Sequence, residues 1–170
     1  MECSFMFYKC IPLLLSFSTS IITPAVLAKQ KEIYPDALPS NVWQTTAVYE
    51  AQNMSLNVID KYPGVVGVSI WDANTNRFEY FDPTDWTTRA KNGGAGYFLI
   101  TGNKREQINF FDNGVVLART LEKLTPNEFT YSRTVPREMK SGAPDVTIFV
   151  VHTPLKVEHQ FTFSPNIEKK

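Results

Sequence analysis

Two arginines in one expected β-hairpin are the residues of this chain best suited to bind a ligand. The segment 115–135, VVLARTLEKLTPNEFTYSRTV, alternates apolar and polar side chains on both sides of a Thr-Pro-Asn turn. If Leu124 faces Glu128 across that turn, Arg119 lies opposite Arg133 on one face of the hairpin. Because a guanidinium keeps its proton, two arginines that point into a protein interior require an anion or ordered water.

A carboxylate placed between these arginines would relieve their repulsion through paired hydrogen bonds. Tyr131 lies on the same face and could add its hydroxyl, while Tyr80 and Phe129 are aromatic candidates for lining the pocket. The ligand-binding hypothesis therefore rests on Arg119, Tyr131, Arg133, Tyr80 and Phe129.

The same residues also fit arrangements that bind nothing. One arginine could stack on Trp43 and close the end of a barrel, while the other pairs with Glu79 or Glu106. Alternatively, the arginine face could be the outer face. The many aromatic side chains more often fill a core than line a pocket, and an eight-stranded barrel is narrow enough for side chains to fill it.

The two histidines, His152 and His159, flank a Thr-Pro-Leu sequence. No acid stands at metal-ligand spacing from them, so we expect surface or strand-end histidines and no metal site. Neither histidine has a nucleophile or an orienting carboxylate close in sequence, which disfavours an enzyme. We expect no catalytic residue and no cofactor.

Short β-strands joined by turns must position these residues. We expect strands at 42–49, 65–71, 77–81, 96–101, 107–111, in both arms of 115–135, and at 146–152 and 159–163. No helix is long enough to cross between parallel strands. The pattern predicts an all-β fold, a small antiparallel up-and-down barrel of about eight to nine strands, with a β-sandwich as the alternative.

Strict alternation along these strands predicts which side chains face the interior. The expected inner residues are Val66, Val68, Ile70, Phe78, Tyr80, Tyr97, Leu99, Ile108 and Phe110.

The chain divides into four segments. Residues 1–28 resemble a secretory signal peptide, because an apolar run is followed by Val-Leu-Ala, with cleavage expected after Ala28; an uncleaved anchor is the alternative. Residues 29–40 are expected to form a flexible leader, strapped over the domain or disordered outside it. The barrel domain spans 41–164, and 165–170 form a solvated tail.

Composition favours export and argues against nucleic acid. Both cysteines, Cys3 and Cys10, fall in the signal peptide, so the mature domain has no disulfide, which fits a periplasmic or secreted bacterial protein. The chain has 17 Lys and Arg against 17 Asp and Glu and shows no basic patch, so no nucleic-acid partner is expected. We expect no integral membrane segment after signal cleavage, because the apolar run is too short to span a bilayer.

The pieces VGVSIWDANTNRFEYFD, GYFLIT, LEKLTPNEFTYSR and VVHTPL resemble an uncharacterised bacterial family of exported domains of unknown function with a lipocalin-like barrel. The resemblance covers residues 42–155 and implies a small antiparallel barrel with an interior pocket, without an established activity. The first strand departs from lipocalins proper, since Trp43 follows Asn41 and Val42 rather than Gly-x. By analogy, intracellular fatty-acid-binding barrels hold a carboxylate with arginines and a tyrosine.

Three functions are compatible with these observations. The first is an exported barrel that binds a small apolar or anionic molecule, such as a hydrophobic carboxylate. The second is a periplasmic protein-interaction or inhibitor module that acts through loops at 82–96, with Trp86, and at 136–144. The third is a small-barrel isomerase or cyclase.

Overall fold

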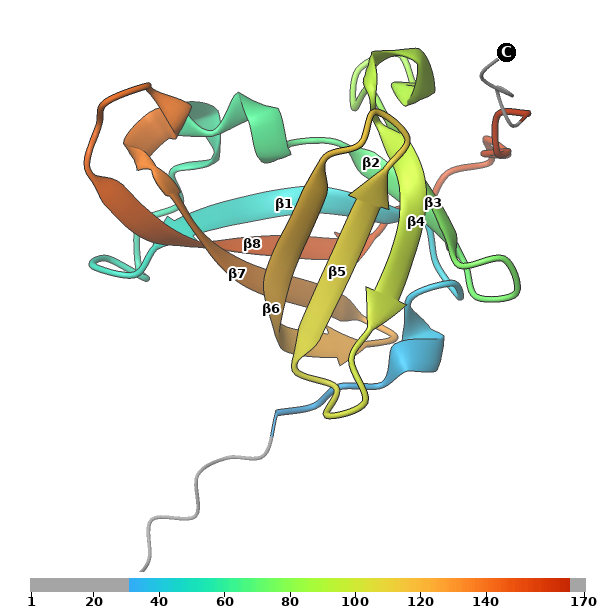
Figure 1. Ribbon diagram of the computed structural model, residues 1–170, viewed down its shortest axis with the longest axis horizontal. Helices are drawn as coiled ribbons and strands as arrows, with labels where there is room; N and C mark the ends of the chain where they lie inside the picture. Colours follow the sequence, from blue (N-terminus) through green and yellow to red (C-terminus); the bar gives the residue numbers. More distant parts are fainter. Residues whose placement is uncertain (1–30, 166–170) are drawn as a thin grey trace, which may run out of the picture. The chain divides into compact units, whose positions relative to one another are not determined.

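Eight antiparallel strands close into one up-and-down barrel, in which each strand pairs with the next and β8 pairs back with β1 (Figure 1). The computed structural model describes residues 31–165. The expected signal peptide, residues 29–30 of the expected leader and residues 166–170 of the tail lie outside this range. The expected barrel is confirmed, and the sandwich alternative is wrong.

The strand bounds follow from the ladder pairing. The strands are β1 (Trp43–Glu50), β2 (Val68–Asp72), β3 (Arg77–Phe81), β4 (Ala95–Ile100), β5 (Glu106–Phe111), β6 (Val116–Thr125), β7 (Glu128–Pro136) and β8 (Asp145–Pro154). The 3-10 helix η1 (Pro35–Ala37) precedes β1, and four more three-residue 3-10 helices lie in connections between strands: η2 (Ile59–Lys61), η3 (Pro63–Val65), η4 (Ala90–Asn92) and η5 (Arg137–Met139). None of the helices in residues 31–165 has the length and apolar character needed to cross a membrane.

The β6–β7 hairpin reaches the expected arginine placement by an unexpected route. The assumed pairing of Leu124 with Glu128 is wrong, because Leu124 pairs with Phe129 across a tighter turn. A bulge near the middle of β6 then shifts the register by one residue. Both Arg119 and Arg133 therefore point inward and line the same pocket. Without the bulge, Arg119 would face outward.

In β4 and β5 the alternation is one residue out of phase with our expectation. The residues expected inside that lie on the outer face are Tyr97, Leu99, Ile108 and Phe110. The interior instead receives Phe98 from β4 and the polar Gln107 and Asn109 from β5, which are both 0% exposed. The expectation was wrong because it assigned the apolar side of each strand to the interior, whereas this part of the barrel is apolar outside and partly polar inside.

In β2 the inner and outer faces are also the opposite of those expected, because the C-terminal segment packs on the outer face. Val68 and Ile70 lie outside the barrel in a small apolar cluster, with Phe161 packed against it, while Trp71 points into the main core. The expected strand at 159–163 is wrong, because these residues pair with no strand. They run over the outer face of β2 and β3, seen beside these strands in Figure 1. Val66 precedes β2.

Residues 31–40, expected as a flexible leader, close one end of the barrel. Leu38 is fully buried, and its carbonyl oxygen accepts a hydrogen bond of 2.8 Å from the Trp43 indole. Backbone hydrogen bonds of 2.7 and 2.8 Å tie Tyr34 and Glu32 to Leu124 in β6. Aromatic side chains fill the barrel above this end, so the space left for a ligand lies toward the opposite end.

Candidate functional site

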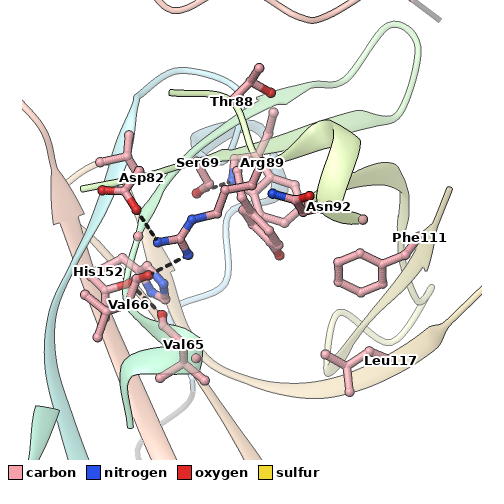
Figure 2. Close-up of a pocket in the computed structure, with 18 of the residues that line it drawn as sticks. Val65, Val66, Ser69, Asp82, Thr88, Arg89, Asn92, Phe111, Leu117 and His152 are labelled. Atoms are coloured by element: carbon pink, nitrogen blue, oxygen red, sulfur yellow. Dashed lines mark hydrogen bonds and ion pairs between the residues drawn. The ribbon is translucent and has the colours of Figure 1, made fainter. Parts of the chain in front are cut away.

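A pocket of about 440 Å³ lies inside the barrel and is framed by residues 64–67 of the β1–β2 connection and 87–94 of the β3–β4 connection (Figure 2). The structure brings all five candidate residues to its wall: Tyr80, Arg119, Phe129, Tyr131 and Arg133. Apolar side chains form other parts of the wall, with Phe111 and Leu117 on one side in Figure 2.

Arg119 is buried in the interior of the barrel. The residue is 7% exposed, and its Nη2 donates a hydrogen bond of 2.9 Å to the Tyr80 hydroxyl oxygen. The guanidinium lies over the Tyr131 ring, with its central carbon 4.3 Å from the ring centroid. Its Nε is buried and has no acceptor among residues 31–165. The charge is thus stabilised by aromatic faces and still has donor capacity.

Arg133 is less well satisfied than Arg119. Its Nη2 approaches only the Met139 sulfur, at 4.0 Å, and its Nε is buried without an acceptor in the described part of the chain. Burial lowers the pKa of Arg133, and the positive charge of Arg119 lowers it as well. The two guanidinium groups therefore repel each other across the pocket.

Neither arginine is neutralised by a carboxylate within residues 31–165. The alternative pairing with Glu79 is wrong, because Glu79 points to the outer face, where its carboxylate accepts hydrogen bonds from Thr88 and from the backbone and side chain of Ser164. Glu106 is exposed and forms no ion pair in this range. Trp43 packs edge-on against Phe129 rather than under an arginine.

Tyr80 connects Arg119 to Asn109 on the inner face of β5. Its hydroxyl oxygen accepts hydrogen bonds from Arg119 Nη2 and from Asn109 Nδ2, the latter at 3.1 Å. Burial raises the pKa of Tyr80, so its hydroxyl stays protonated at neutral pH. Since both lone pairs of this oxygen are used, its own hydrogen is left to donate to a third group.

His152 was expected at the surface or at a strand end, but its ring points into the barrel. His152 is 7% exposed and stacks on Phe129 and Tyr131, at centroid distances of 4.9 and 5.5 Å. Its Nδ1 lies 3.0 Å from the Phe129 carbonyl oxygen, so Nδ1 carries the hydrogen of the neutral ring. Burial lowers the pKa of His152 to about 3, which makes it a weak base at neutral pH. The regular inward positions of Val146, Ile148 and Val150 in β8 were the signal that could have found it.

His159 and Trp86 lie away from the pocket interior. His159 is exposed and its ring contacts the Trp86 indole at a centroid distance of 4.8 Å, and the Phe161 ring contacts the same indole at 5.8 Å, both in tilted arrangements. The two histidines are thus separated by the barrel wall. Residues 31–165 contain no group of three or more His, Cys, Asp or Glu side chains that could hold a metal ion.

Arg89, which was not expected to be part of the site, crosses the mouth of the pocket. Figure 2 shows its guanidinium between two loops, donating to the Val66 carbonyl oxygen at 3.0 Å and to Asp82 at 3.1 Å. Glycine is required at position 94, where the backbone passes close to Arg89, since a Cβ there would lie 2.5 Å from the Arg89 Cβ. Arg89 therefore links the two connections that frame the entrance.

A comparison of the sequence with known protein families gives a match that covers the barrel. The family model described as Domain of unknown function (DUF4822) matches residues 35–163, which include all eight strands and every pocket residue discussed above. No curated protein matches the sequence. Since the match spans most of the chain and the whole barrel, the chain belongs to the family described as Domain of unknown function (DUF4822).

Proposed function

We propose that this barrel binds a small, largely apolar molecule through an anionic group, most simply a carboxylate. The observation that carries the proposal is a pair of guanidinium groups, that of the buried Arg119 and that of the half-buried Arg133, on the wall of one pocket without a carboxylate partner in residues 31–165. Two like charges that are partly withdrawn from water are costly, and an anion between them converts the repulsion into hydrogen bonding.

The rest of the pocket suits the apolar part of such a ligand. Trp71, Phe111, Leu117 and Phe129 line it together with the arginines. A volume of about 440 Å³ falls in the range that accommodates small molecules. An apolar wall with a few convergent donors is the usual arrangement for binding a molecule by its apolar body and orienting it by its polar end.

We also propose that the protein acts in the periplasm or outside the cell. The support is the apolar run followed by Val-Leu-Ala in residues 1–28 and the absence of cysteine from the sequence after Cys10. Cell fractionation with an antibody against the barrel domain tests this. Recovery of the full-length chain in the cytosolic fraction alone would refute export.

Calorimetric titration with decanoate and with its uncharged methyl ester tests the binding proposal. We expect decanoate to bind at least about ten-fold more tightly than the ester, because a hydrogen bond to a charged group contributes about 1.5–3 kcal/mol. Arg119→Gln and Arg133→Gln should each remove most of this preference. Arg105→Gln, at an exposed position, is the control and should keep it.

Two results would refute the proposal. One is equal affinity of the wild-type protein for decanoate and the methyl ester. The other is an unchanged preference in both pocket variants, provided that their thermal unfolding remains cooperative. Either result would mean that the arginines do not recognise an anion.

A protein-interaction module is the second candidate, because the outer face of β4 and β5 is apolar and exposed. Tyr97 is 45% exposed and pairs across the strands with Phe110, and Leu99 beside them is 51% exposed. Patches of this kind often mark contact surfaces. Affinity capture with wild-type protein and with Leu99→Lys tests it, and a partner list unaffected by the substitution would count against this face. Trp86 is a weaker anchor than expected, since it packs on the chain's own C-terminal segment.

A further inference from the structure

The C-terminal segment, residues 155–165, is attached to the outer face of β2 and β3 at two points. The Phe161 ring packs on the Phe81 ring at a centroid distance of 5.0 Å, in the apolar cluster outside the barrel. The Ser164 amide and hydroxyl each donate a hydrogen bond of 2.7 Å to the carboxylate of Glu79, which is 0% exposed. Glu79 forms no ion pair with any residue in 31–165. Because a buried carboxylate is costly without hydrogen bonds, Glu79 stabilises the attached position of this segment.

The same carboxylate holds the entrance loop, which we define as residues 82–88 of the β3–β4 connection. Thr88 Oγ1 donates to the carboxylate of Glu79 and lies 3.3 Å from the Ser164 hydroxyl oxygen. The end of the entrance loop and the end of the C-terminal segment thus share one buried charge. Loss of the Ser164 contacts opens this carboxylate to water and weakens its hold on Thr88.

Trp86 is a second link between the C-terminal segment and the entrance loop. Its φ is +59°, a left-handed conformation that a bulky residue adopts only at a cost in free energy. The indole contacts the rings of His159 and Phe161, and these contacts offset that cost. The attached segment therefore holds the entrance loop in a strained conformation, which the loop can leave when the segment detaches.

The entrance loop controls the group that crosses the pocket mouth. Asp82 and Thr88 line the pocket together with Arg89. The Arg89 backbone is anchored to β3, because its N–H donates to the Tyr80 carbonyl oxygen at 2.8 Å. Its guanidinium depends in part on the entrance loop, since Nη2 donates to the Asp82 carboxylate (Figure 2). A displacement of the loop therefore moves the Arg89 guanidinium while the barrel stays intact.

We infer that the C-terminal segment regulates ligand exchange through the pocket mouth. While the segment is attached to Glu79 and Trp86, the entrance loop keeps Arg89 across the mouth, and release of the segment opens it. This inference rests on the proposed anion binding and adds a regulation of the same site. Release separates no pair of strands, because β8 ends at Pro154, before the segment begins, and the barrel is closed by the ladder of β8 with β1.

A double variant of the full chain, Phe161→Ala with Ser164→Ala, loosens the segment without changing a pocket residue. Phe163→Ala is the matched control, because this ring lies on the same segment and is 36% exposed. Hydrogen exchange of the Asp82 and Trp86 amides, which donate to carbonyl oxygens within the entrance loop, reports the state of the loop. Exchange at both amides should be at least about ten-fold faster in the double variant, with amides of β7 unchanged. The control should match the wild type.

Ligand exchange is measured on the same proteins by stopped-flow fluorescence. Anilinonaphthalene sulfonate is bound first and is then displaced by excess decanoate, so that the signal follows probe that shares the site of the carboxylate. Release should be about five-fold faster in the double variant, the factor that corresponds to the loss of one hydrogen bond. Ser164→Ala alone, a milder change, should shift both measurements in the same direction and serves if the double variant does not fold.

The outcomes separate this inference from the proposed function. Unchanged amide exchange in a folded variant would show that the segment does not hold the entrance loop, and the inference would be wrong while anion binding stands. Faster amide exchange with an unchanged release rate would overturn the regulation of the mouth. If the wild-type protein holds no probe that decanoate displaces, the proposed function fails and the inference falls with it.

Discussion

Acidification should destabilise this barrel through His152, the histidine enclosed by the barrel. Burial lowers the pKa of the folded ring from its ordinary value of 6.5 to about 3. The unfolded chain therefore takes up a proton at a higher pH than the folded chain does. The stability that comes from keeping this ring neutral is fully present above pH 6.5 and is lost progressively as the pH falls from 6.5 toward 3.

The size of the effect follows from the gap between the two pKa values. At pH 5 the unfolded imidazole is about 1.5 pH units below its own pKa, while the folded ring is still neutral. At 1.36 kcal/mol per unit, His152 alone should cost about 2 kcal/mol of unfolding free energy between pH 7 and pH 5.

Urea unfolding of the wild-type protein and of His152→Gln at pH 7 and pH 5 measures this contribution. Buried or paired carboxylates also respond to acid, so the quantity of interest is the difference in acid sensitivity between the two proteins. The variant should lose about 2 kcal/mol less than the wild type over this interval. His159→Gln is the matched control, because the chain has two histidines and His159 is exposed. It should respond to acid as the wild type does.

One result would show that the reasoning about His152 is wrong. If His152→Gln and the wild-type protein lose the same free energy between pH 7 and pH 5, the ring does not stay neutral in the folded state. Titration of the His152 ring by NMR provides a second check, since its signals should not shift between pH 8 and pH 5.

Three further predictions concern other parts of the barrel. Glu79→Gln should lower the unfolding free energy by about 1–3 kcal/mol and expose the C-terminal segment to protease, because the buried carboxylate holds Ser164 through two hydrogen bonds of 2.7 Å. Arg89→Gln should release a bound fluorescent apolar anion, anilinonaphthalene sulfonate, about five-fold faster in stopped-flow measurements, because the link between the entrance loops is lost. Phe98→Ala should cost about 3–5 kcal/mol in urea unfolding, whereas Leu99→Ala should cost less than about 1 kcal/mol, because only the first side chain is buried.

Each of these predictions has a control or an outcome that contradicts it. Glu106→Gln changes an exposed carboxylate and is the control for Glu79→Gln. Equal losses of unfolding free energy in the two variants would show that the Glu79 charge does not hold Ser164 on the outer face. An unchanged release rate in Arg89→Gln would mean that the loops do not restrict exit. Equal costs at Phe98 and Leu99 would mean that the face of β4 is assigned incorrectly.

Local features of this fold follow from the sequence because they depend on neighbouring residues. The β3 strand forms at the expected residues Arg77–Phe81. The expected turn after β5 is present, with Gly114 at a φ of +90° that favours glycine. In the β2–β3 turn, the Asp72 carboxylate accepts hydrogen bonds from the Asn74 amide and the Thr75 hydroxyl. Such short-range hydrogen bonding specifies turns wherever the chain lies.

The candidate pocket follows from the sequence only in part. Alternation identifies the two faces of a strand, but it does not say which face the rest of the chain will cover. Arg119 was expected inside on the basis of a turn register that is wrong. It nevertheless points inward, because a bulge in β6 shifts the register by one residue. His152 and Arg89 were missed because their neighbours in space come from other strands and loops.

The sequence by itself determined the class of fold, the order of the strands and the position of most turns, since hydrogen bonding and side-chain preference act over a few residues. Only the tertiary structure decided that Gln107 and Asn109 face inward while Tyr97, Leu99 and Phe110 face outward. The physical reason is that closure of the whole barrel selects the inner face of each strand. The inward side chains of a strand must lie on the same side of the sheet as those of the two strands beside it.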